Sequence, residues 1–78
     1  MIKVDGYNDA IIGVSWDDRL VYDIDKMIAI LVDRDSMTPD DAYEFLIYNV
    51  FESFIGEKQP IYAQIDDFMI EEALNVER

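Results

Sequence analysis

The sequence contains no cysteine and no histidine among its 78 residues. Without cysteine the chain forms no disulfide, and without both residue types it lacks the usual ligands of a structural zinc ion. The same absences exclude a nucleophilic site built on a cysteine, or on a serine activated by a histidine. We therefore expect a protein that is not an enzyme and that carries no cofactor.

Basic residues are also scarce. Six Lys and Arg stand against 18 Asp and Glu, which gives a formal net charge of −12. A chain this acidic repels nucleic acid and anionic lipid, so we expect no direct nucleic-acid binding and a partner protein that is basic. The C-terminal half is the acidic pole, since residues 38 to 57 and residues 60 to 77 each hold five acids and no base.

Long apolar runs are missing as well. The longest unbroken one, from Met27 to Val32, falls far below the ~18 residues of a membrane span, so we expect a soluble protein with no membrane partner. The length of 78 residues predicts a single compact acidic domain, residues 1–78. Apolar residues still make up 51% of the chain, more than one small core readily hides. A dimer, or a face covered by a partner, would account for the surplus.

The pattern along the chain predicts an α+β fold that begins with a short β-hairpin. Residues 10–16 and 19–22 are the two strands, and Asp17 and Asp18 form the turn. Alternation places Ile12, Val14 and Trp16 on one side of the first strand. Gly13 inside that strand indicates either a bulge or the end of a short helix.

Two central helices, a brief third strand and a C-terminal helix are expected to follow. Asp23 caps a helix to about Arg34, and Thr38 with Pro39 starts another that runs to about Phe54. The third strand covers residues 61–63, after Pro60. The last helix covers residues 65–76, and the apolar residues expected to face inward on it are Ile65, Phe68, Met69 and Ala73.

The helix expected over residues 39–54 is apolar on two sides, which one core does not easily cover. One stripe consists of Ala42, Phe45, Leu46 and Val50, and the other of Tyr43, Ile47, Tyr48 and Phe51. The second stripe belongs either to the core or to an interface with another protein, to which Tyr and Phe are well suited.

Acidic residues on the last helix form a second candidate interface. Asp66, Asp67, Glu71 and Glu72 repeat at an interval of five residues, a rise of roughly 7.5 Å, which is about two phosphate steps along a DNA strand. Such a face imitates a nucleic-acid backbone and would block a basic DNA-binding protein. The alternative is a solvated helix face in an acidic protein.

The spacing suggests two metal sites, and the first, Asp5, Asn8 and Asp9 beside Gly6, more simply forms a turn. The second is a calcium loop. Asp33, Asp35, Asp41 and Glu44 occupy its positions 1, 3, 9 and 12. Position 5 is Met37, which has no side-chain oxygen, and position 6 is Thr38, where the sharp turn requires glycine. We therefore predict no metal site.

Several short words in the chain resemble a widespread family of small, uncharacterised bacteriophage proteins. They are DGYNDAIIG at residues 5–13, VYD at 21–23, MT at 37–38, NV at 49–50 and GEKQPIY at 56–62. The resemblance implies a viral source and a location in the cytoplasm of the bacterial host, and it brings no known activity, cofactor or site residue.

Together these features lead to two hypotheses about function. The first is a phage accessory protein that acts by contact with a host or phage protein, such as a host or defence nucleic-acid-binding protein inhibited through the acidic face. The alternative is a homo-oligomeric structural or virion-associated component, a homodimer in the simplest case, with no inhibitory activity.

Overall fold

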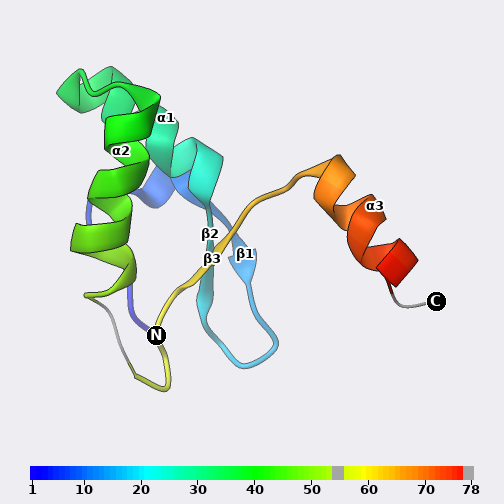
Figure 1. The fold of residues 1–78 in the computed structure, drawn as a ribbon. Coiled ribbons are helices and arrows are strands. Elements are labelled where there is room, and N and C mark those ends of the chain that lie inside the picture. The colour runs from blue at the N-terminus through cyan, green and yellow to red at the C-terminus, as the bar shows by residue number, and fades with distance from the viewer. Residues whose placement is uncertain (54–55, 77–78) are drawn as a thin grey trace.

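The computed structural model describes residues 1–53 and 56–76 and has the α+β fold that the sequence predicts (Figure 1). Within these residues it contains three α-helices, a three-stranded sheet and two short helical segments of other kinds. In chain order the elements are η1 (a 3-10 helix, Asn8–Ala10), β1 (Ile11–Val14), β2 (Leu20–Asp23), α1 (Ile24–Asp35), α2 (Pro39–Leu46), η2 (a π-helix, Ile47–Phe51), β3 (Ile61–Ala63) and α3 (Asp67–Val76).

The predicted hairpin is confirmed, because β1 pairs with β2 in antiparallel orientation. The register shifts between Ile11 and Gly13, so Gly13 marks a bulge, one of the two options that its place in the strand left open. Exposed residues alternate with half-buried ones from residue 11 to residue 16. Ile12, Val14 and Trp16 are the exposed ones, so they form the solvent side of the strand.

Strand β3 lies parallel to β2, and the sheet order is β1-β2-β3. The sequence predicts the third strand at these residues and does not predict its neighbour. Parallel strands need a long crossover connection, and α1, α2 and η2 together provide it. The pairing sets Tyr62 beside Tyr22 on the side of the sheet that meets the helices.

Helix α1 begins as predicted, at a cap made by Asp23. The carboxylate of Asp23 accepts a hydrogen bond from the backbone N–H of Lys26 at 3.2 Å. Met27 and Leu31, from the apolar face that the periodicity indicates, are fully buried. The helix ends at Asp35, because Ser36 takes a left-handed conformation with φ of 57°.

Helix α2 starts at Pro39 as predicted, and the hydroxyl of Thr38 accepts a hydrogen bond from the backbone N–H of Asp41 at 3.2 Å. After Leu46 the chain widens into the π-helix η2. Val50 lies four residues after Leu46, and both are on the buried side. The helical path ends at Phe51, and Phe54, its expected last residue, lies outside the described residues.

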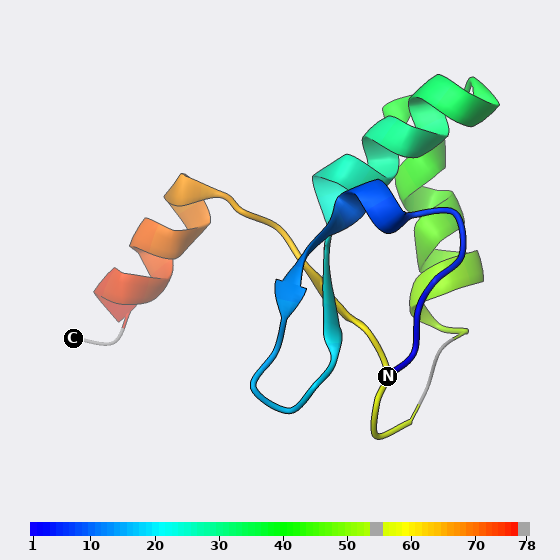
Figure 2. The ribbon, with the colours of Figure 1, turned by 180° about the vertical axis from the view of Figure 1, so that it is seen from behind.

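The core lies between α1, α2 and the sheet, and the N-terminal segment closes one side of it (Figure 2). Tyr22 is fully buried at its centre, and the Tyr22 hydroxyl accepts a hydrogen bond from the backbone N–H of Val4 at 2.9 Å. The buried apolar residues are Val4, Tyr7, Ala10, Tyr22, Met27, Leu31, Ala42, Leu46 and Val50.

Helix α3 stands apart from this core at the end of an extended segment (Figures 1 and 2). It begins at Asp67, and the prediction that its apolar residues face inward is wrong: Phe68 is 68% exposed and Met69 57%. Ile65 precedes the helix and is exposed too, as is Ala73. The radius of gyration is accordingly 13.6 Å, against about 11.5 Å for a compact chain of this length.

Candidate functional site

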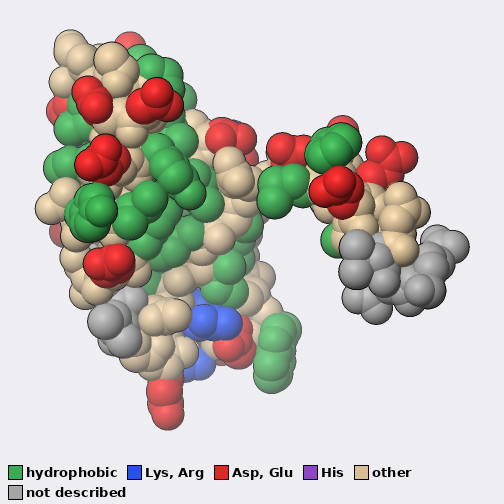
Figure 3. All heavy atoms as spheres, in the orientation of Figure 1, with side chains coloured by type: hydrophobic (Ala, Val, Ile, Leu, Met, Phe, Trp, Pro, Cys, Tyr) green, Lys and Arg blue, Asp and Glu red, His purple; other side chains and the backbone are tan. Residues whose placement is uncertain are grey.

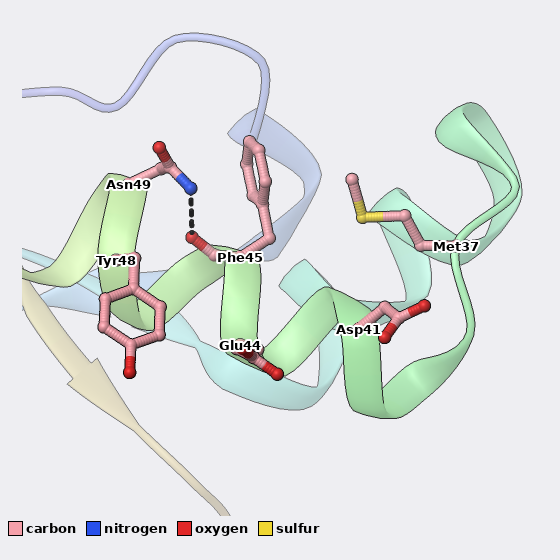
Figure 4. Close-up of a pocket in the computed structure, with 6 residues that line it drawn as sticks. All are labelled: Met37, Asp41, Glu44, Phe45, Tyr48 and Asn49. Carbon is pink, nitrogen blue, oxygen red and sulfur yellow. Dashed lines mark hydrogen bonds between the residues drawn. The ribbon is translucent and has the colours of Figure 1, made fainter.

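A shallow groove runs along the outer side of α2 and has a volume of about 420 Å³ (Figure 4). The carboxylates of Asp41 and Glu44 lie along one edge, while Phe45 and Met37 supply apolar surface. The residues that line this α2 groove are Met37, Asp41, Glu44, Phe45, Tyr48 and Asn49.

The local sequence explains how the groove forms. The Thr38 cap fixes where α2 begins, so Asp41, Glu44 and Tyr48 follow at intervals of three and four residues and share one side of the helix. Past Leu46 the π-turn changes the backbone pairing, and the side-chain N–H of Asn49 donates to the carbonyl oxygen of Phe45 at 3.1 Å. This bond holds the end of the groove in place.

The second apolar stripe predicted for this helix divides between core and surface. Phe51 packs on Tyr62 of β3, with 4.4 Å between the ring centroids, and Ile47 is half-buried. Tyr43 and Tyr48 are 46% and 66% exposed. Sequence periodicity does not separate these two groups, because the contact of Phe51 with Tyr62 joins residues far apart in the chain.

The chemistry of the α2 groove suits a cationic side chain. Asp41 and Glu44 make no ion pair with any Lys or Arg in residues 1–53 and 56–76. Exposed Tyr48 presents a ring beside them, and aromatic rings attract ammonium and guanidinium groups. Figure 3 shows acidic side chains around a broad apolar area on this face of the molecule.

The four acids predicted as an interface on α3 are all exposed, and they do not form one row. Asp66 lies just before the helix, and its carboxylate accepts hydrogen bonds from the backbone N–H groups of Phe68 and Met69 at 3.0 and 3.2 Å. A step of five residues turns an α-helix by about 140°, so Asp67 and Glu72 point to different sides. Asp67 and Glu71, four residues apart, share a side.

Three described residues have a clearly shifted pKa, and all three lie outside the α2 groove. Burial raises the pKa of Tyr62 to about 12, with a smaller contribution from neighbouring Tyr22. A hydrogen bond from Ser15 lowers the pKa of Asp17, and the carboxylate of Asp35 raises the pKa of Arg34.

The described part of the chain has neither a metal-binding cluster nor a membrane-spanning helix. No group of three or more acidic side chains there is placed so as to hold a metal ion. Among the same residues, no helix combines the length and apolar content that crossing a bilayer requires.

Comparison with family models, with curated proteins and with solved structures yields no match for this chain. The resemblance to small phage proteins therefore stays a prediction.

Proposed function

We propose that this chain acts by contact with another protein and that the α2 groove binds a basic segment of that partner. One observation carries the proposal: the exposed ring of Tyr48 lies beside the carboxylates of Asp41 and Glu44, which have no cationic neighbour of their own among the described residues. A lysine or arginine placed there gains both an ion pair and a cation–π contact.

The net charge supports the same class of partner. At −12 the chain attracts basic proteins over long range, so association is fast at low ionic strength and slows as salt screens the charges. Proteins that bind nucleic acid carry clustered Lys and Arg for contact with phosphates. A host or defence protein of that kind carries the Lys and Arg residues that the α2 groove would bind. Where those residues are also the ones that contact DNA or RNA, binding to this chain inhibits the partner.

The resemblance to small phage proteins supplies the biological setting of the proposal. It supports a phage accessory protein that works in the cytoplasm of the bacterial host. Exposed Asp67 and Glu71 on α3 offer a second acidic surface to the same basic partner.

The test begins with affinity capture from a bacterial lysate at low and at moderate salt, followed by mass spectrometry. The captured partner is then titrated against two variants. One carries Asp41→Asn, Glu44→Gln and Tyr48→Ala, and we expect it to bind at least tenfold more weakly, on the order of 1.4 kcal/mol. A control with Asp9→Asn and Glu57→Gln removes two exposed charges elsewhere and should bind almost normally.

A third variant separates the two acidic surfaces. It converts the α3 acids to amides: Asp66→Asn, Asp67→Asn, Glu71→Gln and Glu72→Gln. If this variant alone lost binding, the site would lie on α3 and not in the α2 groove. If all variants bound like the parent chain, with the same salt dependence, recognition of a basic partner through these surfaces would be refuted.

A further inference from the structure

Two apolar surfaces of this chain are uncovered, and the α2 groove includes neither of them. The first, called here the α3 stripe, consists of Met69, Ile70, Ala73 and Leu74, which lie on one side of α3 at helical spacing. The second, called the hairpin ridge, consists of Ile12, Val14 and Trp16. We propose that the α3 stripe of one copy packs on the hairpin ridge of a second copy, and the reverse, in a two-fold symmetric dimer.

The chain holds α3 away from its own hairpin. The connecting residues 64 to 66 form neither helix nor strand, and the side-chain N–H of Gln64 lies 3.5 Å from the carboxylate of Asp25 at the start of α1. In Figures 1 and 2, α3 lies beyond the hairpin, on the side opposite α2. Exchange of one identical element between two copies is a low-cost route from such an arrangement to a dimer.

The apolar area is large enough for a stable dimer. Ile65 and the large residues of the α3 stripe and the hairpin ridge are all exposed. At about 100 Å² for each partly exposed aliphatic side chain, and roughly twice that for Trp16, each copy offers on the order of 800 Å². Because the exchange is reciprocal, the dimer buries about 1,600 Å², the size typical of stable protein interfaces.

The tip of the hairpin is rigid, which lowers the entropic cost of binding there. Asp17 accepts hydrogen bonds from the Ser15 hydroxyl through its carboxylate and from Lys58 Nζ through its backbone carbonyl, the latter at 2.8 Å. The guanidinium of Arg19 pairs with the same carboxylate at 3.0 Å. Trp16 nevertheless remains 95% exposed on this fixed loop. A large aromatic residue on a pre-formed turn is typical of the residues that dominate binding energies.

The charges around the ridge also favour an acidic helix as the occupant. Two of the six basic residues, Arg19 and Lys58, lie at the hairpin tip and balance Asp17 and Asp18. In Figure 3 the visible Lys and Arg side chains lie at this end of the molecule. An acidic helix such as α3 therefore meets less repulsion here than on a surface with the average charge of the chain.

The dimer leaves the α2 groove free. The groove belongs to the other end of the molecule, whereas Asp67 lies at the edge of the stripe, on the same side of α3 as Leu74 seven residues later. The inference therefore goes beyond the proposed function and stands or falls separately from it.

The first test combines the mass in solution with the fluorescence of Trp16, the only tryptophan. From micromolar to several hundred micromolar protein, we expect the mass to rise from monomer to dimer and the Trp16 emission to shift to the blue over the same range. Leu74→Asp should abolish both changes. Phe68→Asp is the matched control, because it adds the same charge on the same helix, away from the stripe, and should leave both changes in place.

The second test exploits the absence of native cysteine. Two single-cysteine variants, Val14→Cys and Ala73→Cys, are mixed and oxidised under mild conditions. We expect a disulfide-linked heterodimer of one Val14→Cys chain and one Ala73→Cys chain. Phe68→Cys, on the opposite side of α3, should link to Val14→Cys at least tenfold more slowly.

Three outcomes would overturn the inference. A strict monomer at all concentrations would exclude the dimer, whether Trp16 is exposed or is shielded by α3 of its own chain. A dimer that leaves Trp16 fully exposed would mean that the two α3 helices pair with each other. A dimer without the Val14–Ala73 crosslink would mean that a different face forms the interface.

Discussion

Tyr22 and Tyr62 show how neighbouring residues of one type can have opposite effects on stability. The two rings lie side by side across β2 and β3, with 6.0 Å between their centroids. The Tyr22 hydroxyl bonds the backbone of Val4, while the buried Tyr62 hydroxyl has no hydrogen-bond partner in the described part of the chain. A buried polar group without a partner lowers stability, so removal of the two hydroxyls should have different consequences.

We predict that Tyr22→Phe lowers the free energy of unfolding by about 1 to 3 kcal/mol, because the N–H of Val4 is left buried without an acceptor. Tyr62→Phe should be neutral or slightly stabilising. Urea unfolding of the two variants, followed by circular dichroism, measures both effects. Equal destabilisation by the two changes would show that the Tyr62 hydroxyl has a partner in solution.

The raised pKa of Tyr62 also predicts that the protein loses stability at high pH. Its pKa is about 12 in the folded protein, against an ordinary value of 10.0 that the unfolded chain should show. Above pH 10 the unfolded state therefore loses the Tyr62 proton first, and the stability that this group provides is lost as the pH rises from about 10 through 12. Unfolding at pH 8 and pH 11 should differ less for Tyr62→Phe than for the parent chain, whereas Tyr48→Phe, an exposed control, should behave like the parent.

At the scale of the elements, substitution of Thr38 tests whether the N-terminal cap of α2 supports the α2 groove. Thr38→Ala removes the acceptor for the backbone N–H of Asp41 and should cost about 1 kcal/mol of stability, while Thr38→Ser keeps the oxygen and should cost less. Because Asp41 lines the groove, Thr38→Ala should also weaken binding of the captured partner. Thermal unfolding and a binding titration measure the two effects, and identical behaviour of the Ala and Ser variants would contradict the role of the cap.

Elements that depend on local signals are those that the sequence predicts well. Asp23 and Thr38 mark the starts of α1 and α2 because their side chains bond nearby backbone N–H groups, and both predictions are confirmed. The hairpin and its bulge at Gly13 are local too. The parallel pairing of β2 with β3 depends on a contact between distant residues, Val21 and Ile61, which periodicity does not encode.

The candidate site shows the same limit. Sequence reasoning selects Tyr43 and Tyr48, which are exposed, together with Phe51, which is half-buried and packs against Tyr62. It misses the contribution of Asn49 to the α2 groove, because that contribution depends on the π-turn. For α3, an apolar stripe indicates that something covers the helix and does not indicate what. The sequence therefore led to the wrong expectation that its apolar residues face the core of the same chain.

At the scale of the whole molecule, the net charge of −12 makes salt a test that separates the two proposals. Binding of a basic partner to the α2 groove gains from attraction, so it should weaken as salt rises. The dimer brings together two chains of the same charge through apolar surfaces, so it should strengthen when salt screens their repulsion. As salt rises from low to moderate, the dissociation constant of the partner complex should increase and that of the dimer should decrease. A dimer that weakens with salt would point to an interface held by ion pairs.

Deletion of α3 tests whether this helix contributes to the stability of the monomer or only to that of the dimer. None of the described residues that form the core or pack against it belongs to α3, so a chain that ends at Gln64 should melt at the same temperature as dilute full-length protein. The full chain should melt at a higher temperature as its concentration rises, because dimer formation stabilises the folded state, while the shortened chain should show no such rise. Calorimetry at several concentrations measures both quantities. A shortened chain that is less stable even at high dilution would show that α3 folds back on its own core, and a concentration dependence that survives the deletion would place the dimer interface elsewhere.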